Sequence, residues 1–165
     1  MIVIAVAFFE VVLAVHIMAA VVAFGVTFAY PIMFVVGAKH EPRSLPLLHR
    51  IEYTIERWLI NPGLTVVVIC GIYLATKLEV WSDFYVQWGL GAAIVIGGLV
   101  GSVMIPTAKK AESAAARDVA AAGEGELQMS EEYQALVRRL TRVGTLLSGL
   151  VLVTIYFMAT HTGAS

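Results

Sequence analysis

Few residues of this 165-residue chain could do chemistry in an apolar environment, and His16 is the first of them. It lies in a long apolar run, with Ala19, Ala20 and Ala23 on the adjacent turns of the expected helix. An imidazole beside small side chains could ligate a haem or a metal ion, or it could hydrogen-bond a neighbouring helix. Because ionisable residues inside apolar spans are a default indication of function, His16 is the main candidate ligand.

Two further sets of residues have the chemistry of metal ligands. Met158 and His161 are three residues apart, and a thioether with an imidazole suits copper. His49, Glu52 and Glu56 recur at three- and four-residue spacing, which places them on one helical face. A divalent ion could bind there, but the alternating charges around these residues are more typical of a face exposed to water or lipid headgroups. We therefore predict no metal site.

Composition and motifs limit the remaining function classes. The chain has no phosphate-binding glycine loop, nucleophile elbow, paired CxxC or HExxH motif, so no catalytic residue can be assigned. Its 11 basic and 12 acidic side chains give a formal net charge of -1 and no basic excess for nucleic acid. Apolar residues make up 59% and charged residues 14%, against about 25% charged residues in soluble domains. This composition predicts a membrane protein.

Four apolar runs approach or exceed the roughly 20 residues that a transmembrane helix needs. They cover residues 11–36, 58–75, 84–106 and 143–159. Ten of the eleven basic residues fall in the first and third connections, and the second connection has only Lys77. By the positive-inside rule, these two connections are cytoplasmic and both termini lie outside. We predict a single domain, 1–165: an all-α, polytopic four-helix membrane bundle with helical cytoplasmic extensions.

Local signals predict where the helices begin, bend and end. Pro31 predicts a kink, and Pro62 predicts a break or kink before the second span, because proline lacks an amide proton and disfavours helix at the preceding residue. Ser44 and Ser130 are expected N-caps. Gly123 marks a turn in the third connection.

Small residues recur every four positions in the third span, at Gly89, Ala93, Gly97 and Gly101. Such a stripe permits close approach of another helix, from this chain, from a second copy or from a larger membrane complex. A flat cofactor ring lying against the glycines is the alternative.

Three stretches of the sequence carry a family resemblance: His16 with Tyr30-Pro31, the segment IERWLINPG at 55–63, and GIYL at 71–74. With these residues the chain resembles the four-helix membrane proteins around HemJ-type protoporphyrinogen oxidases and copper-resistance D proteins. It looks closest to an uncharacterised bacterial branch of predicted integral membrane proteins.

The resemblance implies a bacterial inner-membrane protein that binds haem b through His16. Two positions depart from the HemJ-type pattern, since Ala23 stands where those enzymes have tryptophan and Ile32 where they have arginine. No lysine is found early in the third span either. We therefore expect a haem-binding or redox-related bundle of unassigned activity. The alternatives are a non-catalytic accessory subunit of a membrane complex and, third, a copper-handling protein.

Overall fold

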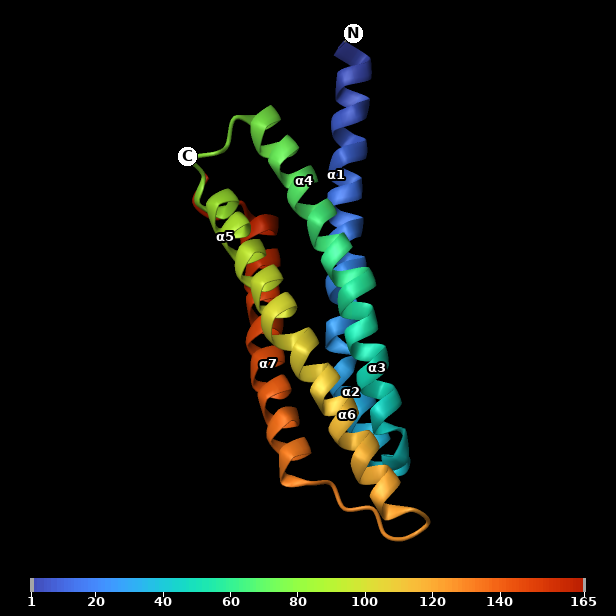
Figure 1. Cartoon of the computed structure of the whole chain (residues 1–165). Coiled ribbons are helices and arrows are strands. Elements are labelled where there is room, and N and C mark those ends of the chain that lie inside the picture. Colours follow the sequence, from blue (N-terminus) through green and yellow to red (C-terminus); the bar gives the residue numbers. More distant parts are fainter. Residues whose placement is uncertain (1, 165) are drawn as a thin grey trace.

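The computed structural model describes residues 2–164, which fold into four long antiparallel helical rods (Figure 1). The first rod contains α1 (Ile2–Gly25), η1 (Val26–Phe28) and α2 (Tyr30–His40). The second contains η2 (Pro42–Ser44), α3 (Leu45–Ile55), η3 (Glu56–Ile60) and α4 (Asn61–Leu78). The third contains α5 (Phe84–Leu99), η4 (Val100–Met104) and α6 (Ile105–Ala122), and the fourth is α7 (Glu131–Thr160).

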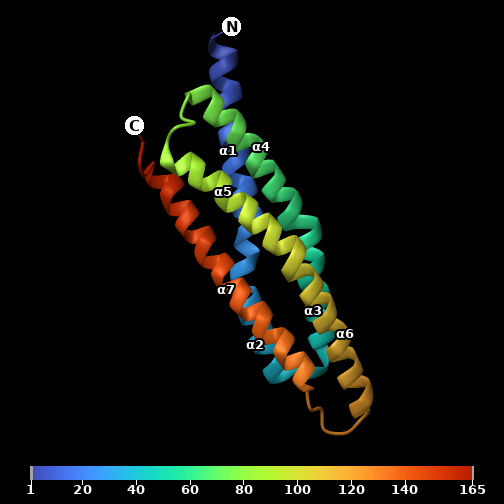
Figure 2. The ribbon, with the colours of Figure 1, turned by 60° about the vertical axis from the view of Figure 1, so that its left-hand side comes forward.

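Each rod contains a stretch long and apolar enough to cross a membrane. The predicted all-α, four-helix membrane fold is thereby confirmed. Both termini and the α4–α5 connection lie toward one end of the bundle (Figure 1). The α2–α3 junction and the 123–130 loop lie at the opposite end, which we call the loop end (Figures 1 and 2). Which end faces the cytoplasm stays a prediction.

The rods contact one another in pairs along their length. Near the termini α1 packs on α4 and α5 packs on α7, whereas α6 packs on α3 toward the loop end (Figure 2). The face of α6 in this contact is made of small residues, and α3 can approach closely because they occupy little space. The fully buried alanines on it are Ala108, Ala111, Ala114 and Ala115.

Each proline inside a rod follows a turn that is not α-helical. A 3-10 turn, η1, precedes Pro31, and the π-helical turns η3 and η4 each end two residues before a proline, Pro62 and Pro106. In a π turn the hydrogen bonds join residues i and i+5 instead of i and i+4. This local change in hydrogen bonding accommodates the amide proton that proline lacks, and the helix continues. A kink was predicted at Pro31, and η1 interrupts the α-helix just before it. At Pro62 a break or a kink was predicted; a break is wrong, because the second rod stays helical through η3, and a kink stays a prediction.

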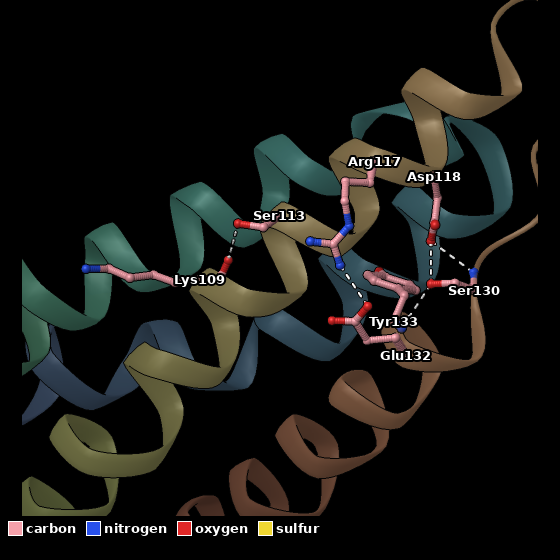
Figure 3. A network of polar contacts seen from close by, with 7 residues as sticks. All are labelled: Lys109, Ser113, Arg117, Asp118, Ser130, Glu132 and Tyr133. Carbon is pink, nitrogen blue, oxygen red and sulfur yellow. Dashed lines mark hydrogen bonds and ion pairs between the residues drawn. The ribbon is translucent and has the colours of Figure 1, made fainter.

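The start of α7 agrees with the sequence. The Ser130 hydroxyl accepts the Tyr133 amide at 3.2 Å, as an N-cap should, and the Asp118 carboxylate holds Ser130 through two 2.9 Å bonds (Figure 3). Ser44 differs, because it stands before α3 but its hydroxyl donates to the Glu41 carbonyl at 2.7 Å and caps nothing. The turn expected at Gly123 is present, with a positive φ of 52° that suits glycine.

Candidate functional site

His16 lies at the interface between α1 and α4 and is partly buried. Its Nδ1 is 2.9 Å from the Val67 carbonyl oxygen, so Nδ1 carries the proton that it donates. A Cβ on Gly71 would lie 3.3 Å from the His16 Cε1, and glycine at this position leaves room for the ring. In a neutral imidazole held this way, Nε2 is the unprotonated nitrogen and the one able to ligate a metal.

Ala23, one of the three alanines near His16, does not line an open space. Ala23 is fully buried, and a Cβ added to Gly63 of α4 would lie 2.6 Å from the Ala23 Cβ. The small face of α1, considered as room for a haem or metal, is filled at this position by the backbone of α4. Any macrocycle ligated by His16 would have to lie on another side of the ring.

A second group of polar side chains is buried toward the loop end of the bundle. It consists of Tyr30 from α2, His49 and Glu52 from α3, Glu56 at the start of η3 and Tyr133 from α7, and we call it the buried polar cluster. His49 and Glu56 are only 1% and 2% exposed, and they are the largest fully buried side chains among the described residues.

Hydrogen bonds join three members of the buried polar cluster in a row. The His49 Nδ1 is 2.9 Å from the Glu52 Oε2, and its Nε2 is 3.2 Å from the Tyr133 hydroxyl. The Phe34 ring packs against the imidazole at a centroid distance of 4.5 Å. With Glu52 ionised, Nδ1–H donates to the carboxylate and Nε2 accepts the Tyr133 proton, so every bond in the row has a donor and an acceptor.

Two atoms of the buried polar cluster have no hydrogen-bond partner among the described residues. They are the Tyr30 hydroxyl and the Glu56 Oε2. A buried polar atom left unpaired costs roughly 1–3 kcal/mol, and more when it is charged. Such atoms in a folded protein call for an explanation, and an unseen ligand, ion or proton is one.

The solvated face predicted for His49, Glu52 and Glu56 is therefore wrong. α6 packs over this part of the second rod, and the alanines of α6 allow the cover to be close. From α7, Tyr133 reaches the His49 ring. Of the charged residues in this pattern, Arg50 and Arg57 remain exposed, and the Arg50 Nε donates to the Glu112 Oε1 at 2.8 Å. Within residues 2–164 no three His, Cys, Asp or Glu side chains are arranged to hold a metal ion.

Sequence reasoning did not identify Tyr30 and Tyr133 as members of this site. One signal was available for each: Tyr30 precedes the proline of the first rod, and Tyr133 is the third residue after the Ser130 cap. Both signals place a tyrosine in the half of the bundle nearer the loop end. Neither shows that the two hydroxyls point inward.

A cavity of about 450 Å³ opens beside the buried polar cluster at the loop end. Tyr133 forms part of its wall, together with Phe34, Leu45, Met129 and Val137. Tyr133 is thus both a wall of this cavity and a hydrogen-bond partner of His49. The row of hydrogen bonds therefore leads from Glu52 toward a space that the loop end could open to water.

The candidate copper residues pack against α5. The Met158 methyl occupies the space where Gly89 lacks a side chain, and the His161 ring meets the Tyr85 ring edge-on at 5.3 Å. These contacts give both side chains a role in helix packing. Copper binding by them stays a prediction.

The small-residue stripe of α5 is divided between internal contacts and open surface. Gly89 faces Met158, and a Cβ on Gly97 would lie 3.1 Å from the Leu64 side chain. Gly101 is exposed, and a Cβ there would meet nothing within 4 Å. Part of the stripe therefore packs the chain's own helices, and its end at Gly101, which lies in η4, is open to another molecule.

Comparison with known proteins gives one match. A family described as "Predicted integral membrane protein (DUF2269)" matches residues 10–162, which include most of α1 and all later helices. No curated protein and no solved structure matches the chain. The match supports the uncharacterised membrane family of the sequence resemblance, and it is not to the HemJ-type oxidases or the copper-resistance D proteins.

Proposed function

Since the chain belongs to the DUF2269 family of predicted integral membrane proteins, we propose that it acts within the bilayer by binding haem b through His16. The observation that carries the proposal is the 2.9 Å bond from the His16 Nδ1 to the Val67 carbonyl. Metal-ligating histidines almost always donate their other ring N–H in this way, which fixes the tautomer and raises the basicity of the ligand nitrogen. The resemblance to HemJ-type proteins supports the same residue.

The α1–α4 interface would orient the ligand. Val67 fixes the direction of the imidazole, and Gly71 leaves the space in which the ring lies. A bound haem would supply one-electron chemistry, and its potential would depend on the axial ligands and on the polarity around them. What this chain provides is a neutral imidazole, held in one orientation within an apolar helix pair.

The first prediction tests this ligand. Protein expressed with haem available and purified in mild detergent should show a Soret band, and His16→Ala should remove it, because Nε2 is then lost. The variants His40→Ala and His161→Ala change histidines outside the α1–α4 interface and should keep the band. A colourless wild-type protein, or a band of equal strength in His16→Ala, would contradict haem ligation by His16.

The site of action we propose is the bacterial inner membrane, with the loop end in the cytoplasm. The charges at the loop end support this orientation. The exposed arginines Arg138, Arg139 and Arg142 lie in the part of α7 nearer the loop end, where they can contact lipid phosphates. The α4–α5 connection at the other end has only Lys77 beside it.

A second candidate function is that of an accessory subunit that binds another membrane helix. The open position at Gly101 favours it, since glycine on an exposed helical surface permits close approach of a partner. The partner would be a second copy of this chain or a subunit of a larger complex.

A pair of matched substitutions separates internal packing from association. Gly97→Leu should lower the free energy of unfolding by roughly 1 kcal/mol, because the new side chain displaces Leu64. Gly101→Leu should leave the free energy of unfolding unchanged. If the protein is an accessory subunit that binds another helix at this surface, the same substitution should reduce oligomer size or co-purification of the partner. Unfolding in mixed micelles and size-exclusion chromatography measure the two effects. An unchanged assembly in Gly101→Leu would argue against a partner at this surface.

A further inference from the structure

The buried polar cluster has too few cations for its carboxyl groups. Glu52 and Glu56 are 4% and 2% exposed, and no lysine or arginine is among the members of the cluster. A buried charge is tolerated only when it is paired, hydrogen-bonded or neutralised. Glu52 has the His49 imidazole as its partner, but the Glu56 Oε2 has none among the described residues. Glu56 therefore needs a positive charge from outside the chain.

A proton fits this need better than a metal ion. Within residues 2–164 no three potential ligand side chains are arranged around a metal position. A proton needs no coordination shell, and it converts the Glu56 carboxyl from an acceptor into a donor. The Tyr30 hydroxyl is the other unpartnered buried group, and it lies within the electrostatic range of both carboxyls. A protonated Glu56 thus reduces the charge of the cluster and gains a group able to hydrogen-bond.

We propose that Glu56 is a proton-binding site and that Glu52, His49 and Tyr133 conduct protons between it and the cavity at the loop end. The geometry that carries this is the continuous row of bonds Glu52–His49–Tyr133, which begins one helical turn from Glu56 and ends at the cavity wall. The proposal makes no use of His16 or haem, so it stands or falls separately from the function proposed above.

The proton balance of one uptake event is simple. A hydronium ion in the cavity gives a proton to the Tyr133 oxygen as the Tyr133 hydroxyl proton passes to the His49 Nε2. The resulting imidazolium releases its Nδ1 proton to the Glu52 carboxylate. No hydrogen bond joins the two carboxyls among the described residues, so the protonated Glu52 carboxyl must rotate toward Glu56, four residues along the helix, to pass the proton to it. One proton has moved from water to Glu56, and His49 ends as the Nε2–H tautomer. The reverse sequence restores the first tautomer and returns the proton to the cavity.

The charged and titratable groups around Glu56 are few. α2 contributes Tyr30, α3 contributes His49 and Glu52, and α7 contributes Tyr133. The neighbouring Arg57 is exposed and lies over the Trp58 ring, 5.7 Å from its centroid.

The other elements around the cluster add no cation to it. The α6 face buried against α3 is made of Thr107 and alanines, and Lys109 of α6 lies over the Tyr53 ring at 5.5 Å. Asp118 of α6 acts on Tyr133 electrostatically and holds Ser130. Along α4 no ionisable residue follows Arg57 before Cys70, and α1 has Glu10 and His16 in its part away from the loop end.

Infrared spectroscopy of the full-length protein in detergent tests the proton site. A protonated carboxylic acid absorbs above the amide bands, and we expect this absorption at neutral pH in the wild type. Glu56→Gln, which keeps the shape of the side chain, should remove it. Glu124→Gln, the same change at an exposed loop residue, should not. Absence of the absorption in a folded wild type, or its persistence in Glu56→Gln, would overturn the proposal. Its loss on addition of sodium or magnesium chloride would assign the site to a metal cation and would also overturn it.

Hydrogen–deuterium exchange tests the conducting row. After transfer into D₂O, the acid absorption shifts as Glu56 exchanges its proton. Tyr133→Phe should keep the absorption but slow this shift by about tenfold, the order of effect expected when one hydrogen-bonded partner is lost from the path. Tyr156→Phe, at a 61% exposed tyrosine of the same helix, should exchange at the wild-type rate. Equal rates in Tyr133→Phe and wild type would show that protons do not pass through Tyr133 and would overturn the conducting row.

Discussion

Replacing His49 by alanine is expected to lower the free energy of unfolding by about 3–5 kcal/mol, the range seen when a buried charge, here the Glu52 carboxylate, loses its partner. The substitution leaves the Glu52 carboxylate and the Tyr133 hydroxyl without the ring nitrogens that they bond at 2.9 and 3.2 Å. It also leaves a space beside the Phe34 ring, which packs on the imidazole in the wild type. Both effects lower stability, because the first leaves buried polar groups unpaired and the second removes packing around a side chain that is 1% exposed.

Reversible unfolding in mixed micelles, followed by tryptophan fluorescence, measures this loss. His40→Ala is the matched control, since His40 is exposed near the end of α2 and its removal should change stability by no more than about 0.5 kcal/mol. His49→Gln should recover part of the loss, because its amide can still donate to Glu52. A cost for His49→Ala as small as that of the control would show that water reaches the cluster and that its members are not buried together.

The buried polar cluster shows where prediction from this sequence ends. The spacing of His49, Glu52 and Glu56 places them on one helical face, and that part was correct. Whether the face meets water or protein depends on α6 and α7, which follow much later in the chain. The decisive residues are the alanines of α6, whose small size is visible in the sequence but whose partner is not. A local pattern of charges therefore suggested exposure where a non-local contact produces burial.

Helix ends and breaks also differ in how far local sequence predicts them. The Ser130 cap was predictable because its bond to the Tyr133 amide joins residues three apart in the chain. Ser44 has the same chemistry, but its hydroxyl bonds back to Glu41 within a 3-10 turn, so it does not cap α3. Pro62 was expected to break or kink the second rod, and the rod stays helical there by way of a π turn. Sequence alone does not predict whether the helix ends or forms a π turn. Packing along the whole rod decides which of the two costs less free energy.

His16 illustrates a different limit. Its position in an apolar span was correctly identified as unusual, and the structure adds the Val67 carbonyl as its partner. The alanines beside it suggested room for a ligand. A run of small residues in a sequence, however, is the same whether a ligand or another helix packs on it. Here α4 covers Ala23, which has no exposed surface. The same alanine-glycine contact sets how close α1 and α4 approach, and through that distance it sets the bond from His16 to Val67.

Substituting Gly63 by leucine should force α1 and α4 apart and lower the free energy of unfolding by about 3 kcal/mol, near the upper end of the usual cost of overpacking. Even its Cβ would lie 2.6 Å from the Ala23 Cβ and 3.5 Å from the Ala23 Cα, whereas carbon atoms in contact prefer about 3.5–4.0 Å. The Ala23 Cα belongs to the backbone and cannot rotate away. Gly91→Leu is the matched control, because a Cβ on that helical glycine meets nothing within 4 Å.

A double-mutant cycle identifies the contact responsible. Gly63→Ala alone should destabilise the protein, and combining it with Ala23→Gly should recover most of that loss, because the two Cβ atoms then no longer compete for one space. Independent, additive effects of the two substitutions would contradict the contact. The separation of the helices should also break the bond from His16 to the Val67 carbonyl, since Gly63, Val67 and Gly71 follow one another every four residues along α4. If His16 ligates haem, Gly63→Leu should therefore weaken the Soret band, and Gly91→Leu should not.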